Sequence, residues 1–170
     1  MTTTDTAERA DLLESLGVAR HFLKYAVQGL TDEQARQRPT VSELTLGGLI
    51  KHVSEVERQW ARFITEGAVA VAMPEDERGF QEWANGFKLL EDETLAEILQ
   101  RYDAIAAETD KLLQTCDLDA SHELPPAPWF KPGARRSARR TFAHILAETA
   151  QHSGHADILR ESIDGQKTMG

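Results

Sequence analysis

Residues 137–163 read SARRTFAHILAETAQHSGHADILRESI, and this stretch decides the fold. Four polar residues recur in it at steps of three and four positions: His144, Glu148, His152 and His155. Because an α-helix turns once every 3.6 residues, all four project within about 40° of Glu148. Ile145 and Leu159 fall in the same sector. The sequence therefore predicts a long helix that carries ionisable groups within the apolar stripe that faces a core.

Three earlier stretches, 6–30, 45–66 and 92–116, show the same helical periodicity of apolar residues. Proline- and glycine-rich segments separate them. A capping box at 31–34 predicts a short turn that Pro39 closes. Residues 68–91 are expected to form a long connection with a short helix at most, and strands are not expected beyond a short hairpin. Four long helices with two long connections predict an all-α four-helix bundle, in one domain over residues 1–170.

Composition excludes several classes of protein. The 170 residues carry a formal net charge of −9 with a sequence pI near 5.1, which argues against general affinity for nucleic acid or for an anionic membrane surface. The longest apolar runs are far below the roughly 18 residues of a membrane-spanning helix. A polar first segment without a secretory signal, and Cys116 as the only cysteine, favour the cytoplasm.

The polar residues of 137–163 suggest a metal site. A buried carboxylate beside buried imidazoles is costly unless its charge is compensated, and a divalent cation would compensate it. His52, at the margin of the apolar stripe of helix 45–66, can supply a ligand from a second helix. His52, Glu148 and His152 would form a set of three donors with an open coordination position. The spacing equally allows Glu148 to pair with His144 or His152 without any metal.

Other site chemistries are poorly supported. A di-iron bundle needs Glu-x-x-His pairs on two helices, and Glu148 has a glutamine at that spacing. No His-Glu-x-x-His motif is present, and His122 runs with Glu123 into a proline. Cys116 stands beside Asp117, which should raise its pKa rather than activate it. No glycine-rich phosphate loop occurs.

A basic run precedes the last predicted helix and comprises Lys131, Arg135, Arg136, Arg139 and Arg140. It can be a solvated charge run, offset by acidic residues elsewhere. It can also form a basic rim that attracts the carboxylates of an anionic thiol cofactor or substrate. Nucleic acid is the third choice, because no aromatic residues are interleaved with the charges. Trp83 and Trp129, on the two long connections, could wall a pocket above the metal.

Two motifs together resemble a known superfamily. The segment 144–165, HILAETAQHSGHADILRESIDG, resembles the last helix of the DinB/YfiT-like metalloproteins. The segment 45–53, TLGGLIKHV, resembles the one that supplies their first histidine. The resemblance covers most of the chain and is strongest to the branch that contains mycothiol-dependent transferases and maleylpyruvate isomerase.

The resemblance implies one divalent metal ion on His52, Glu148 and His152. A set of two histidines and one glutamate suits zinc, and nickel, iron or manganese could also occupy it. His155 falls where many relatives have glutamine, so it would support a ligand, although it could replace Glu148. The implied activity is a thiol transferase with mycothiol as co-substrate, in which His155 or His144 orients a ligand or relays a proton. A metal-dependent hydrolase and a non-catalytic metal-binding stress protein are the alternatives. A homodimer through the first and third predicted helices is also expected.

Overall fold

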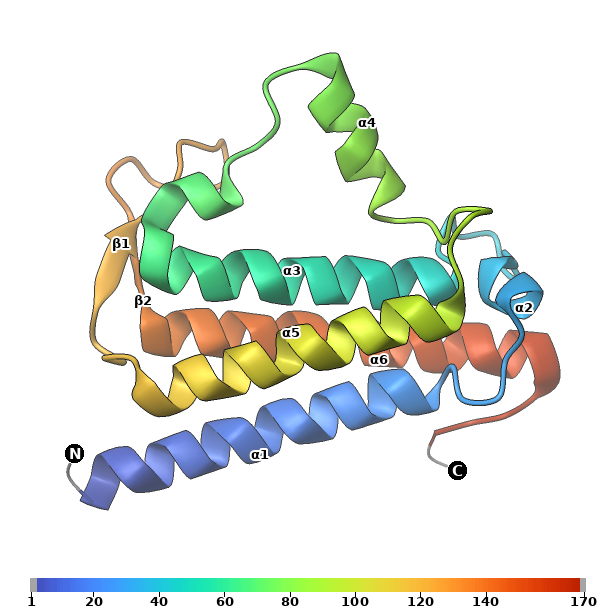
Figure 1. Cartoon of the computed structure of the whole chain (residues 1–170), viewed down its shortest axis with the longest axis horizontal. Coiled ribbons are helices and arrows are strands. Elements are labelled where there is room, and N and C mark those ends of the chain that lie inside the picture. The colour runs from blue at the N-terminus through green and yellow to red at the C-terminus, as the bar shows by residue number, and fades with distance from the viewer. Residues whose placement is uncertain (1–2, 169–170) are drawn as a thin grey trace.

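Four long helices form the body of the molecule (Figure 1). The structure is a computed structural model, and it describes residues 3–168. The long helices are α1 (Thr3–Tyr25), α3 (Leu46–Glu66), α5 (Leu95–Thr115) and α6 (Ala138–Asp164). The predicted all-α bundle is confirmed.

The shorter elements lie in the connections. These elements are α2 (Asp32–Arg36), the 3₁₀ helix η1 (Gly67–Val71), α4 (Glu77–Asn85), β1 (Ser121–Glu123) and β2 (Arg135–Ser137). Strands β1 and β2 pair antiparallel with Ser121 opposite Ser137, so the expected short hairpin is present. The capping box predicted before α2 is also present, since Thr31 accepts a hydrogen bond from the Gln34 amide and the Gln34 side chain accepts one in return.

Two predicted helix boundaries need correction. The first helix ends at Tyr25 rather than near residue 30, because Gly29 has a φ of 76°, outside the helical region. The guanidinium of Arg160 donates to the carbonyls of Ala26 and Gln28 in the turn that follows, at 3.0 and 2.9 Å. Those carbonyls are satisfied from α6 and need no further helical turn. The third long predicted helix, which is α5, begins at Leu95 rather than near residue 92, because Thr94 provides a capping box that fixes its start.

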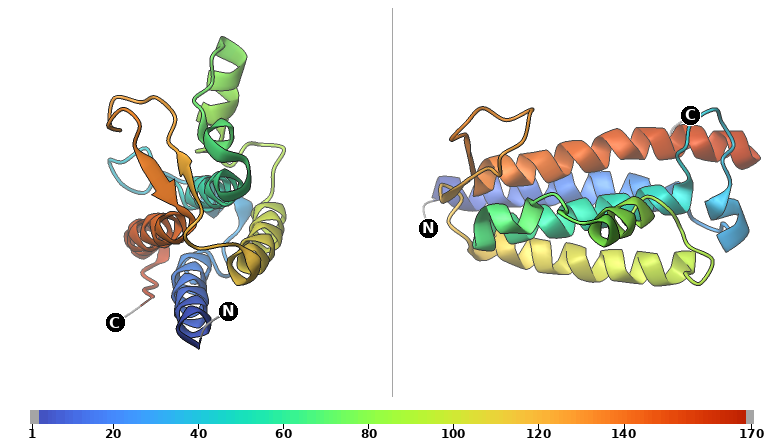
Figure 2. Two further views of the ribbon diagram at one scale, coloured as in Figure 1. Left: turned by 90° about the vertical axis from the view of Figure 1, so that its left-hand side faces the viewer. Right: turned by 90° about the horizontal axis from the view of Figure 1, so that it is seen from above.

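The order of helices around the bundle determines which side chains can meet. Helix α3 packs against α5 and α6, and α1 packs against the same two helices from the opposite side (Figure 2). In Figure 1, α3 and α6 run in opposite directions, whereas α3 and α5 run in the same direction. The chain must therefore return along the bundle between α3 and α5, and η1 and α4 lie on this return path.

The core consists of two apolar clusters, one towards each end of the bundle. Leu49, Val53 and Tyr102 belong to one cluster, and Phe142 and Ile145 belong to the other. Within residues 3–168, no helix is long and apolar enough to span a membrane.

A buried polar layer crosses the same interior. Arg20 of α1 donates from Nη2 and Nε to the carboxylate of Glu57 on α3, at 2.6 and 3.1 Å. A third bond, from Nη1, reaches Asp110 of α5 at 2.8 Å. Three helices are thereby tied together by charge-assisted hydrogen bonds.

Candidate metal centre

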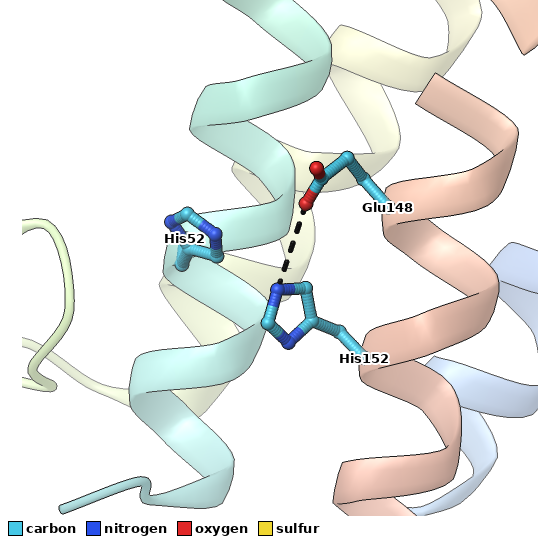
Figure 3. Close-up of side chains that lie close together, drawn as sticks. All are labelled: His52, Glu148 and His152. Atoms are coloured by element: carbon cyan, nitrogen blue, oxygen red, sulfur yellow. Dashed lines mark ion pairs between the residues drawn. The ribbon is translucent and has the colours of Figure 1, made fainter. Parts of the chain in front are cut away.

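Three side chains from two neighbouring helices meet on one side of the bundle. Figure 3 shows His52 on α3 facing Glu148 and His152 on α6. Each offers one ligand atom, and these atoms all lie within 4.8 Å of one another. In the described part of the chain this is the one group of three histidine, cysteine or acidic side chains with that property. The antiparallel contact of α3 with α6 creates it.

Glycines at the start of α3 help to place His52. A Cβ at Gly48 would lie 2.2 Å from the carbonyl oxygen of Phe87, and one at Gly47 would lie 2.8 Å from the Cβ of Leu89. Only glycine allows the segment after α4 to approach this closely. As a result, the Phe87 ring stacks on His52 with centroids 4.6 Å apart and planes 23° apart. The stack restricts the rotation of the His52 ring.

The imidazoles of the group are held neutral. Burial, with a smaller contribution from the charge of His152, lowers the pKa of His52 to about 4. Burial and then the charge of His155 also lower the pKa of His152. A neutral imidazole has the free lone pair that a metal ion needs.

The alternative of simple pairing is poorly supported by the distances. Nε2 of His144 lies 3.9 Å from Glu148, and Nε2 of His152 lies 3.7 Å from it. Both exceed the roughly 3.2 Å limit of a good hydrogen bond. Since His152 is neutral near pH 7, its Coulomb attraction for Glu148 is also small. The carboxylate of Glu148 is therefore left without a hydrogen-bonding partner among residues 3–168.

The donor set fits a divalent cation in type and in size. Metal–nitrogen and metal–oxygen bonds of about 2.0–2.2 Å place neighbouring donors of a tetrahedral site roughly 3.3 Å apart. Donor atoms within 4.8 Å of one another reach that spacing by modest side-chain rotations. Two imidazoles and one carboxylate suit zinc and are also compatible with nickel, iron or manganese.

Two more histidines flank the group on α6. Nδ1 of His155 lies 3.3 Å from Nδ1 of His152, and one of these two nitrogens donates to the other. The second ring nitrogen of His152, Nε2, then faces Glu148. A hydrogen bond of this kind orients a ligand ring. His144 is edge-on to Trp60 with centroids 4.7 Å apart. Burial, followed by the charges of the two arginines at 136 and 140, lowers the pKa of His144 to about 4.

Replacing Glu148 is expected to weaken metal binding far more than replacing His155. Glu148→Gln removes the only negative donor of the group, and we expect a loss of affinity of roughly 100-fold or more, against about tenfold for His155→Gln. Titration with a chelating competitor measures both constants. Glu161→Gln, which removes an exposed carboxylate from the same helix, is the matched control and should bind metal normally. A metal-bound crystal structure with His155 ligated and Glu148 free would reverse the assignment.

The structure separates the four arginines that sequence grouped as a basic rim. Arg139 donates two hydrogen bonds to the carboxylate of Glu8, the longer of them 3.2 Å, and it also forms an ion pair with Asp119. Arg135 donates to the backbone carbonyl of Ser121 at 2.6 Å. The guanidinium groups of Arg135 and Arg139 are thus both bound by other partners within the protein.

Arg136 and Arg140 are placed differently. The guanidinium of Arg136 lies over the ring of Trp60, 4.3 Å from its centroid, and its buried Nη1 has no hydrogen-bond partner. Burial and the nearby charge of Arg140 lower the pKa of Arg136. Arg140 is exposed and makes no side-chain hydrogen bond or ion pair within the described residues. Arg136 and Arg140 thus bring two positive charges close to His144, and neither forms an ion pair with an acidic side chain of the described residues.

Sequence reasoning missed two aromatic contacts at the centre. Trp60 packs against the apolar cluster of Phe142 and Ile145, and its ring also contacts Arg136 and His144. Trp60 follows His52 by eight residues, which is about two turns and roughly 80° around α3, so the spacing alone did not place it beside the donor group. The stacking of Phe87 on His52 had no signal in the sequence, because Phe87 lies in an irregular segment.

The four-helix bundle agrees with the DinB/YfiT-like superfamily that the two sequence motifs resemble. The sequence profile of the family described as Mycothiol-S-transferase matches residues 11–165, and the chain belongs to this family. No functionally curated protein matches significantly. Among solved structures, one described as the conserved protein of locus from Enterococcus faecalis is 18% identical with a TM-score of 0.56, covering 98% of this chain and 99% of that one. This similarity supports the fold alone.

Proposed function

We propose that the protein is a metal-dependent transferase that uses a low-molecular-weight thiol, mycothiol, as the nucleophile toward an electrophilic small molecule. The family description supports both the thiol and the transfer. The observation that carries the metal dependence is the group of His52, Glu148 and His152, whose donor atoms lie within 4.8 Å of one another. Three protein donors leave a position for an exogenous one, as in catalytic rather than structural zinc sites.

The nucleophile in this proposal comes from the co-substrate. Cys116 is the only cysteine of the chain, and burial raises the pKa of its thiol. When bound by His52, Glu148 and His152, a divalent cation would lower the pKa of a neighbouring thiol, so that the thiol reacts as thiolate near pH 7.

The chain's other residues have distinct roles. His155 orients the ring of His152 through the contact between their Nδ1 atoms. His144 lies one turn before Glu148, with its Nε2 3.9 Å from that carboxylate, and can orient it. Its pKa of about 4 makes His144 too weak a base to keep the thiol proton, which passes to solvent. Trp60 covers the ring of His144 edge-on and limits the approach of water from that side.

Arg136 and Arg140 favour the thiolate form of the co-substrate. Their positive potential reaches the centre, since both contribute to the lowered pKa of His144. The same potential stabilises a negative sulfur there and disfavours a neutral thiol. In this proposal, the anion that Arg136 and Arg140 stabilise is the thiolate of mycothiol.

Cobalt substitution tests the proposal. The cobalt-loaded protein should develop a sulfur-to-cobalt charge-transfer band when mycothiol is added, and the native enzyme should transfer mycothiol to a small electrophile. Metal binding without any sulfur band, but with hydrolysis of ester or amide substrates, would identify a hydrolase. Metal binding with neither property would identify a non-catalytic metal-binding protein.

Arg136 is expected to contribute more to thiol binding than Arg139. Arg136→Gln removes an unpaired cation from the His144 side, and we expect the KM for mycothiol to rise roughly tenfold, the equivalent of about 1.4 kcal/mol. Arg139→Gln makes the same change of charge at a side chain already bonded to Glu8, and it should leave that KM nearly unchanged. Metal content should stay the same in both variants. Equal effects of the two substitutions would mean that only net charge matters.

The homodimer stays a prediction, and so does the cytoplasmic location.

A further inference from the structure

Helix α4 stands apart from the bundle although it carries large aromatic residues. Figures 1 and 2 show it above α3, outside the four packed helices. None of its residues is buried, and Phe80 and Trp83 are 46% and 48% exposed. The helix is well formed locally, since Asp76 caps its first turn by accepting from the amide of Gly79 at 2.7 Å. Its aromatic residues are therefore not used in the core.

A cavity of about 430 Å³ lies between α4 and α3. Its apolar and aromatic wall is formed by Val56, Met73, Pro74, Trp83 and Phe87. His52 lines the same cavity, so the cavity and the candidate metal centre share one side chain. The volume falls within the roughly 300–1,000 Å³ of small-molecule sites.

An aromatic path joins α4 to the donor group. The ring of Trp83 is edge-on to Phe87 at 4.9 Å between centroids, and Phe87 stacks on His52 at 4.6 Å. A planar ligand seated against Trp83 and Phe87 would lie next to His52. Aromatic stacking of this kind adds roughly 0.5–1.5 kcal/mol per ring pair beyond the area buried.

The charged residues of the cavity are mostly neutralised by partners. Lys51 is paired with Glu93 at 2.6 Å, and Glu82 is paired with Arg78 at 2.9 Å. Nε of Arg58 donates to the carboxylate of Glu55 at 2.8 Å. Arg101, exposed at the rim, is the remaining charged residue of the lining and makes no side-chain hydrogen bond or ion pair within residues 3–168. A ligand here would therefore meet mostly apolar and aromatic surface, with one cation at the edge. The cavity thus differs from the Arg136 side, where two cations lack an anion.

We infer that the electrophilic co-substrate is a small, uncharged aromatic or apolar molecule that binds beneath α4, with its reactive carbon toward His52. This inference rests on the proposed thiol transfer. The thiol would approach from the Arg136 side, so the two substrates reach the donor group from different directions. A new sulfur–carbon bond forms, the leaving group departs with its electron pair, and the thiol proton goes to solvent.

Two aromatic probes separate binding from turnover. The metal-loaded protein is titrated calorimetrically with 1,3-dinitrobenzene, which has no leaving group, and is assayed with mycothiol and 1-chloro-2,4-dinitrobenzene. In the second case chloride leaves as the sulfur–carbon bond forms. Trp83→Ala should weaken 1,3-dinitrobenzene binding and raise the KM for the chloro compound by about tenfold each, with the KM for mycothiol unchanged.

Matched variants keep the inference falsifiable. Phe80→Ala removes an equally exposed ring from the same helix, outside the cavity, and should have little effect. Trp83→Phe should restore most of the binding, and circular dichroism should show that all variants keep their helix content. Binding of 1,3-dinitrobenzene that depends on Trp83 without any thiol transfer would support the cavity and overturn the transferase. Transfer with a KM insensitive to Trp83, or no binding to the wild-type protein, would overturn the cavity.

Discussion

His52→Ala and His152→Ala are each expected to remove most of the bound metal. The purified protein should contain about one divalent ion per chain, because one set of three donors can be assembled. Loss of either imidazole leaves two donors, and we expect the affinity to fall by more than about 100-fold. Elemental analysis after gentle dialysis, followed by competition with a chelator, measures the effect.

The control for this experiment is another histidine of the chain. His21 is exposed on α1 and has no part in the donor group, so His21→Ala should keep its metal. Circular dichroism should show unchanged helix content in all three variants, since His52 and His152 lie at the side of the bundle rather than in its apolar clusters. Unchanged metal content in both His52→Ala and His152→Ala would reject the site.

Glu57→Ala is expected to lower the free energy of unfolding by about 3–5 kcal/mol, the usual cost of leaving a buried charge without its partner. Glu57 is 0% exposed and Arg20 is 4% exposed. The substitution removes two of the three hydrogen bonds of the Arg20 guanidinium and leaves only the bond to Asp110. Urea denaturation followed by circular dichroism measures the loss.

Two further variants distinguish the buried charge from loss of volume. Glu66→Ala removes an exposed carboxylate from the same helix, where it pairs with Arg62, and should change stability little. The double variant Arg20→Met/Glu57→Leu replaces the pair by apolar side chains of similar size and should recover most of the stability. A single variant Glu57→Ala as stable as the wild type would show that Arg20 is satisfied without Glu57.

The sequence alone determined the long helices and two of the three donors of the candidate centre. Helix periodicity and capping depend on residues a few positions apart, so the four long helices and the cap at Thr31 could be predicted from local patterns. The same holds for Glu148 and His152, which one helical turn brings together whatever α6 packs against. His52 could be predicted from its place at the margin of an apolar stripe and within a motif that resembles the superfamily.

Only the tertiary structure decided which helices are neighbours and which charges meet. The antiparallel packing of α3 on α6 brings His52 to Glu148, and Arg160 of α6 satisfies the Ala26 carbonyl in the turn that follows α1. Arg136 and Arg139 look alike in the sequence, yet one lies over Trp60 and the other binds Glu8. These outcomes depend on the side chains that a packing partner supplies from distant parts of the chain. Local periodicity carries no information about that partner.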